Sequence, residues 1–145
     1  MQTSFTEKQL ENKENKTSET ILRKCVHCGM CNATCPTYGI NGDELEGPRG
    51  RIYLIKDMLE NNKPANKKIA QHIDSCLSCY SCMTTCPSGV NYMHLIDHGR
   101  NHVEETYKKQ KDNILYSVIG LFIIMISETV VKKVFFGEKN SISMG

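Results

Sequence analysis

The sequence predicts an all-α fold with loops around two groups of cysteines. Apolar residues recur at helical spacing between and after the cysteines, and no segment shows the alternation of a β-strand. The eight cysteines fall into two groups of four. A chain of 145 residues has room for one domain, or at most two very small ones.

The charge balance excludes two classes of protein. Lys and Arg number 18 against 16 for Asp and Glu, a formal net charge of +2. This is neither the basic surface of a nucleic-acid-binding protein nor the excess charge of a disordered chain. No nucleic-acid partner is therefore expected. The chain also lacks a Ser/His/Asp triad, a P-loop motif and a dinucleotide-binding fingerprint, so no catalytic residue is assigned.

Residues 1–17 are rich in Lys, Glu, Asn and Gln and are predicted to be a flexible N-terminal segment. Thr6 and Gln9 fit a capping box that would open a short helix. Ser18 is predicted to cap a second short helix, Glu19–Lys24, which delivers the chain to Cys25. No apolar signal-peptide core follows Met1, so export and a disulfide framework are not expected.

Three further helices are predicted from apolar spacing. Pro48 suits the first helical position of one that ends at Asn61, and Pro64 would start the next. The predicted apolar positions are Ile52, Tyr53, Ile55, Met58 and Leu59 in the first, Ile69, His72, Ile73 and Cys76 in the second, and Tyr92, Leu95, Ile96, Gly99, Val103 and Tyr107 in the third.

Residues 108–145 are predicted to form a C-terminal helix and tail. The apolar run Ile114–Ile126 is shorter than the roughly 20 residues that a membrane-spanning helix needs. Glu128 and Lys132 follow closely, and extending the span would bury these charges. We expect a buried or interfacial helix, and both protein and lipid remain open as its contact.

An internal repeat organises residues 18–107. Cys25, Cys28, Cys31 and Cys35 recur as Cys76, Cys79, Cys82 and Cys86, each displaced by 51 residues. Thr34 and Pro36 recur as Thr85 and Pro87 at the same offset. Both motifs read C-x2-C-x2-C-x3-C-P, and together they use every cysteine of the chain.

This spacing is typical of cubane iron–sulfur ligation. Two-residue gaps let three thiolates of one loop face the same cluster, whereas in two-cluster ferredoxins the fourth cysteine binds the other cluster. We therefore predict two [4Fe-4S] clusters. The first is assigned to Cys25, Cys28, Cys31 and Cys86, and the second to Cys76, Cys79, Cys82 and Cys35. Two structural zinc sites are the alternative, although zinc cysteines usually occur as separated pairs.

Other residues near the motifs have alternative interpretations. Gly29 could adopt positive φ and turn an N–H toward sulfur, and Tyr80 occupies its equivalent position. The polar residues Asp43, Glu44, Arg49 and Arg51 fit either capping and surface charge or electrostatics beside a cluster. Arg100 is a further cation available to offset cluster charge.

The histidines are interpreted in the same way. His94, His98 and His102 share a helix face and could form either a metal or proton site or a solvated surface. His27 lies inside the first motif, and packing near the cluster is preferred to ligation.

Segments Cys25–Tyr38 and Gly42–Lys56 closely resemble the iron–sulfur subunit of glycolate oxidase (glycolate dehydrogenase), and so does Cys76–Val90. The match covers about residues 18–107. The Gly-Asp-Glu and Pro-Arg-Gly-Arg-Ile sequences within Gly42–Lys56 are much narrower signals than the cysteine motif alone.

The resemblance implies an α-helical ferredoxin-type domain in a multi-subunit, membrane-associated complex that oxidises glycolate to glyoxylate. In that family FAD-containing subunits perform the chemistry, and the clusters pass electrons toward a membrane quinone. The chain would then be cytoplasmic, either free or peripheral on the cytoplasmic membrane.

The family subunit continues into CCG repeats that are not found here, and residues 108–145 differ from it. The chain is therefore interpreted as a fragment, a truncated gene product or a split subunit. The alternatives are a free-standing two-cluster ferredoxin and a subunit of a related dehydrogenase of the glycerol-3-phosphate, lactate or heterodisulfide reductase type.

Overall fold

The described chain consists of helices joined by turns and loops. The computed structural model describes residues 1–109, 111–112 and 114–117, and this part contains no β-strand, which confirms the predicted all-α class. Met1–Lys108 form one unit, considered below, and Lys109–Gly145 form another. The elements of the first unit are α1 (Glu7–Leu10), α2 (Lys13–Lys24), η1 (Met30–Thr34), α3 (Pro36–Asn41), η2 (Glu44–Glu46), α4 (Pro48–Glu60), α5 (Lys67–Asp74), α6 (Ser81–Thr84), α7 (Tyr92–Val103) and η3 (Glu104–Lys108).

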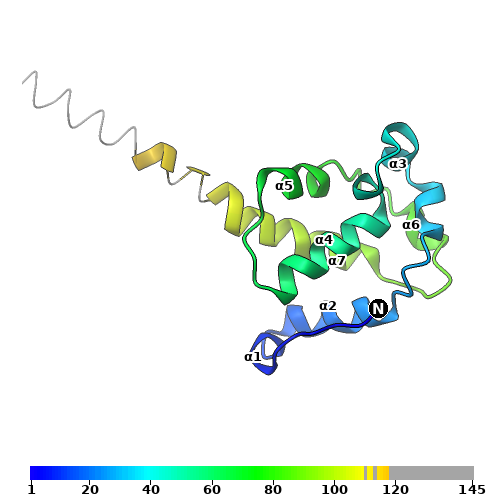
Figure 1. Ribbon diagram of the computed structural model, residues 1–145, viewed down its shortest axis with the longest axis horizontal. Coiled ribbons are helices and arrows are strands. Elements are labelled where there is room, and N and C mark those ends of the chain that lie inside the picture. Colours follow the sequence, from blue (N-terminus) through cyan, green and yellow to red (C-terminus); the bar gives the residue numbers. More distant parts are fainter. Residues whose placement is uncertain (110, 113, 118–145) are drawn as a thin grey trace, which may run out of the picture. The chain divides into compact units, whose positions relative to one another are not determined.

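Helices α4 and α7 pack against each other at the centre of the unit, and α2 and α5 contact both of them (Figure 1). Gly99 of α7 allows this close approach, since a Cβ atom there would lie 2.7 Å from Ile55 Cγ1. The short elements η1, α3 and α6, which follow or carry the cysteines, lie together at one end of the unit (Figure 1). The central helix pair therefore supports both cysteine loops.

The central helices largely follow the predicted pattern. Helix α4 begins at Pro48 and is capped at Asn61, as predicted. Tyr53, which was predicted to belong to the apolar face of this helix, is 56% exposed. Helix α5 begins at Lys67 and not at Pro64, because the Asn66 side chain accepts the Ile69 N–H and supplies the cap. The predicted apolar stripe of α7 is buried along its length.

Residues 1–17 include helix α1 and the first turns of α2. The capping box is confirmed, with the Thr6 N–H donating to Gln9 Oε1 at 2.8 Å. Helix α2 begins at Lys13 behind an Asn12 cap, so the predicted helix start at Ser18 is wrong. The helix runs without a break from Lys13 through Ser18 to Lys24. The preceding segment is attached to α4, because Gln9 Nε2 donates to the Leu59 carbonyl.

Ser18 instead joins α2 to α7. Its side chain is fully buried, and its Oγ lies 2.7 Å from Nδ1 of His98. Burial lowers the pKa of His98, which favours the neutral ring. The two helices are thus joined by a hydrogen bond between polar groups that apolar spacing does not reveal.

The predicted C-terminal helix falls mostly outside the described residues. Residues 114–117 are helical, and the rest of Ile114–Ile126 is not described. Among the described residues, none of the helices combines the length and apolar character needed to cross a membrane.

Gly50→Ala is expected to destabilise the fold strongly. A Cβ atom at Gly50 would lie 2.1 Å from the backbone oxygen of Glu44, so η2 would have to move off α4. Such overpacking costs about 1–3 kcal/mol or more. Gly39→Ala is the matched control, because a Cβ there meets nothing within 4 Å. Urea unfolding of both variants tests this, and an equal midpoint for the two would contradict it.

Stability is also expected to fall as the pH drops below about 6.5, the ordinary pKa of an unfolded histidine. The folded state resists protonation of His98, whereas the unfolded state accepts the proton, so acid favours unfolding until the pH reaches the lowered folded pKa. Urea midpoints between pH 7.5 and 5.5 measure the slope. His98→Gln should flatten it, and an unchanged slope in that variant would contradict the assignment.

Candidate metal centre

The fold collects the eight cysteines into two adjoining pockets. The first is lined by Cys25, Cys28, Cys31 and Cys86, with Cys82 at its wall. The second is lined by Cys35, Cys76, Cys79 and Cys82. Each pocket thus contains three cysteines of one motif and the last cysteine of the other, which is the grouping that the predicted exchange requires.

The two loops repeat each other in backbone conformation as well as in sequence. His27 and Gly29 have φ of 60° and 85°, and their counterparts Ser78 and Tyr80 have φ of 52° and 57°. The positive φ predicted at Gly29 is confirmed. Tyr80 adopts it despite the cost to a residue with a side chain, so the loop geometry itself imposes this conformation.

The two motifs meet at equivalent residues. The hydroxyls of Thr34 and Thr85, which are equivalent in the repeat, lie 3.0 Å apart and form a hydrogen bond. The motifs therefore lie against one another, with Cys35 and Cys86 each lining the pocket of the other motif.

Burial differs among the thiols. Desolvation raises the pKa of Cys31 to about 11 and that of Cys82 to about 12, so both are neutral thiols in the metal-free protein. Metal binding must displace their protons. Cys28 and Cys79, the second cysteine of each motif, are exposed. Each pocket therefore has both a buried and a solvent-facing sulfur.

The second pocket is bordered by side-chain donors that point at sulfur. The Arg51 guanidinium Nη1 lies 4.0 Å from Cys35 Sγ. The Thr37 hydroxyl lies 3.2 Å from the same sulfur, but it accepts from Arg51 and donates its proton to the Glu46 carbonyl at 2.7 Å. The Tyr92 hydroxyl donates to Cys76 Sγ at 3.6 Å. Burial raises the pKa of Tyr92, so the phenol keeps its proton.

Arg51 is completely buried and fully paired. Its Nε donates to the His72 carbonyl at 2.6 Å, and its Nη2 donates to Glu46 Oε2 and Ser75 Oγ at 2.9 Å each. Glu46 also accepts from Ser75 and lies 2.6 Å from His72 Nδ1. Burial opposes ionisation of Glu46, but these hydrogen bonds and Arg51 outweigh it and lower its pKa. The ion pair fixes the guanidinium beside the second pocket.

The first pocket has a different border. His27 lines it, and burial followed by the nearby charge of Arg49 lowers the pKa of His27. Arg49 lies against the loop at Gly29 and is half-buried. Asn32 holds the loop in place, accepting the Arg49 N–H at 3.3 Å and donating to Glu44 at 3.1 Å. Among the described residues, no nitrogen or hydroxyl side-chain donor bonds a sulfur of Cys25, Cys28, Cys31 or Cys86.

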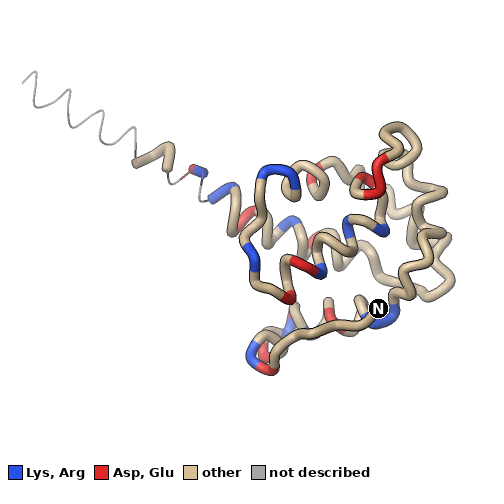
Figure 2. Tube along the Cα trace, viewed as in Figure 1, with Lys and Arg blue, Asp and Glu red and all other residues tan. Residues whose placement is uncertain are grey.

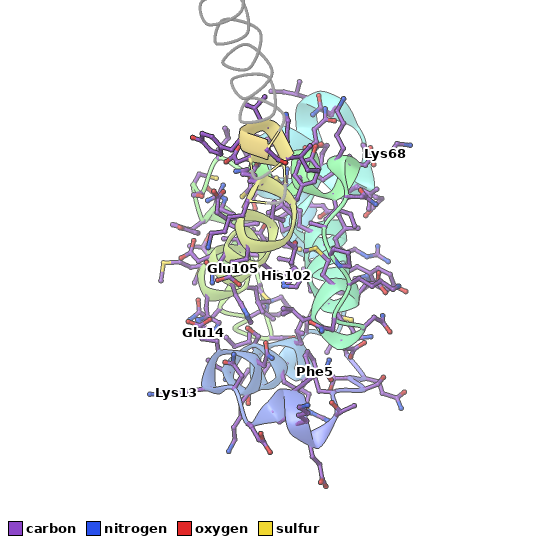
Figure 3. The ribbon with its side chains drawn as sticks, turned by 90° about the vertical axis from the view of Figure 1, so that its left-hand side faces the viewer. Phe5, Lys13, Glu14, Lys68, His102 and Glu105 are labelled. Atoms are coloured by element: carbon purple, nitrogen blue, oxygen red, sulfur yellow. The ribbon has the colours of Figure 1, made fainter. Side chains whose placement is uncertain are left out.

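The histidines of α7 do not converge on one point. His102 Nε2 is 2.8 Å from the Lys63 carbonyl, while His98 faces Ser18. A polar pocket between α1, α2, α4 and α7 includes His98, His102, Glu14 and Glu105, the last three of which Figure 3 labels. In the described part of the chain, no three His, Cys, Asp or Glu side chains are arranged to hold a single metal ion.

Sequence reasoning missed Glu46 and Thr37, which complete the surroundings of the second pocket. One signal for Arg51 was available: it shares a helical face with the buried Ile55 and Met58. A cation on an apolar face predicts a buried partner. Nothing in the local sequence identified Glu46 as that partner. Arg100, predicted to offset charge, donates to the Cys76 carbonyl and Ser78 Oγ at 2.6 Å each.

The donor set fits iron–sulfur clusters. Each pocket is lined by at least four thiols, with Cys82 shared by both, and the described cysteines do not form the tight tetrahedron of a single zinc ion, in which Zn–S distances are about 2.3 Å. The fold and its paired cysteine loops define a two-cluster iron–sulfur domain of the ferredoxin type.

Comparison with known proteins agrees with a two-cluster iron–sulfur domain. Residues 21–90 match the 4Fe-4S dicluster domain, and this part of the chain belongs to that family. The chain is 55% identical over 109 residues to the glycolate oxidase iron-sulfur subunit of Escherichia coli, covering 75% of this chain and 26% of the relative.

A probable glycolate oxidase iron-sulfur subunit of Bacillus subtilis is 33% identical over 108 residues, covering 71% of this chain and 24% of the relative. The succinate dehydrogenase iron-sulfur subunit of Paracoccus denitrificans is 29% identical over 76 residues, covering 48% and 29%. The chain therefore spans about a quarter of the length of the glycolate oxidase relatives. No solved structure matches it significantly. The predicted resemblance and the two [4Fe-4S] clusters are confirmed.

Proposed function

We propose that Cys25, Cys28, Cys31 and Cys86 hold one cluster and that Cys76, Cys79, Cys82 and Cys35 hold the other. The observation that carries this assignment is the membership of the two pockets, each with three cysteines of one motif and the last of the other. When bound, each [4Fe-4S] cluster would carry one electron at a time.

The protein's residues position and expose these sites. The buried cysteines and α4 and α7 fix the loops, whereas Cys28 and Cys79 bring one sulfur of each site to the surface. Val26 and Leu77, equivalent in the repeat, line the two pockets and are 67% and 66% exposed. Each site thus has an apolar, accessible edge suited to contact with a redox partner.

We further propose that the chain is the electron-carrying part of a complex that oxidises glycolate to glyoxylate. Its partners would be FAD-containing subunits, with a membrane quinone as the final acceptor. The 55% identity to the E. coli glycolate oxidase iron-sulfur subunit supports this role. Because a quinone resides in the bilayer, the chain would work in the cytoplasm at the periphery of the cytoplasmic membrane.

Paired cysteine substitutions test the ligand assignment by iron content. The intact chain should hold about eight iron atoms, four per cluster. Cys35→Ala with Cys79→Ala removes two ligands of one proposed cluster and should leave about four iron atoms. The matched variant, Cys35→Ala with Cys28→Ala, removes one ligand from each cluster and should leave almost none.

Iron and sulfide analysis of anaerobically purified protein gives the result. The reverse order, with more iron in the Cys28 pair than in the Cys79 pair, would show that each motif completes its own cluster. Equal iron content in the two variants would also contradict the assignment.

Reduction by substrate tests the larger role. The tagged chain, purified from its own cells, should bring down flavin-containing subunits, and glycolate should bleach its iron–sulfur absorbance. Lactate and glycerol-3-phosphate serve as matched substrates for the related dehydrogenases. Bleaching by either of these but not by glycolate would contradict the proposal, as would purification without flavin.

A further inference from the structure

The surroundings of the two cysteine pockets differ in charge and in hydrogen bonding to sulfur. Residues 25–42 and 75–96, which contain both motifs, include no Asp, Glu, Lys or Arg, as Figure 2 shows. Charges that act on the pockets must therefore come from other elements. Arg51 of α4 is the fully buried cation among the described residues that reaches a cysteine sulfur.

We propose that Arg51 and Tyr92 are positioning residues that make the second site easier to reduce than the first. The inference rests on the proposed cluster assignment. Reduction adds negative charge, and hydrogen bonds to the sulfurs and nearby positive charge favour that state. The side chains around the second site supply both, through Arg51 at Cys35 and Tyr92 at Cys76.

The arrangement of the ion pair supports this role. Nη1 of Arg51 faces Cys35, whereas Nη2 binds the Glu46 carboxylate and Ser75. The sulfur and the carboxylate thus contact different nitrogens of the guanidinium. Because the guanidinium is buried, solvent screens its effect on the second site weakly.

The first site has cations nearby, but they are arranged differently. The Met1 ammonium bonds the backbone oxygens of Arg23 and Cys25, and Arg49 lies beside Gly29. Both Met1 and Arg49 are half-buried, and neither bonds a sulfur. The only side-chain hydrogen bond that a first-site sulfur makes within the described chain is from Cys31 Sγ to Asn32 Oδ1, in which sulfur is the donor.

The test is an anaerobic redox titration of the cluster-loaded full chain, followed by EPR. Two midpoint potentials are expected. Tyr92→Phe keeps the buried ring and removes only the hydroxyl, so it should lower the higher potential and leave the lower one unchanged. We expect about a tenfold loss in the reduction equilibrium, which is about 59 mV for one electron. Tyr53→Phe is the matched control at an exposed tyrosine and should move neither potential.

Arg51 is tested by replacing it together with Glu46, because replacing Arg51 alone would leave the buried Glu46 carboxylate without its partner. Glu46→Gln with Arg51→Gln removes both charges. This double variant should lower the higher potential, with at least a tenfold loss in the reduction equilibrium of that site. Glu46→Gln alone should raise the same potential. If the double variant does not retain its clusters, Tyr92→Phe decides the question alone.

A shift of the lower potential, or of neither, would overturn the inference while leaving the proposed function intact. Wild-type protein with fewer than two clusters would overturn both. Iron and sulfide content measured on each sample distinguishes these cases.

Discussion

The facing arrangement of two cysteine loops, 51 residues apart in sequence, is the constraint on which this structure depends. The Thr34–Thr85 hydrogen bond lies where the repeats meet, and the arrangement brings Cys35 and Cys86 to opposite pockets. Helices α4 and α7 supply the support, and Gly99 lets them approach closely. Cluster binding that uses a ligand from each loop would join the two halves of the domain, so folding and metal binding should be coupled.

Charge is the second constraint. Two oxidised clusters with eight thiolates add about −4, which changes the formal +2 of the chain to about −2. The loops themselves carry no Asp, Glu, Lys or Arg. Arg49 and Arg51 of α4 and Arg100 of α7 lie beside them, and these three arginines differ in burial and in the groups they bond. Sites of the same ligand type thereby acquire different electrostatic surroundings.

The features that could be predicted from the sequence are those set by the local spacing of residues. The cysteine repeat, the helix beginning at Pro48 and the buried stripe of α7 all depend on spacing and are present in the structure. Prediction from the sequence failed for residues whose role depends on a partner distant in the chain. Ser18 looked like a cap, but it is buried against His98 from a helix 80 residues away. The burial of Arg51 depends on Glu46, whose role no local pattern marks. Helix α5 starts at Lys67 and not at Pro64, because the Asn66 side chain caps it.

The presence of two clusters is tested most directly by metal and sulfide analysis of the anaerobically purified chain, with EPR after reduction. We predict about eight iron and eight sulfide per chain, with two interacting cubane signals and no zinc. About two zinc and no sulfide would contradict it, and the two cysteine pockets would then have to be structural metal sites.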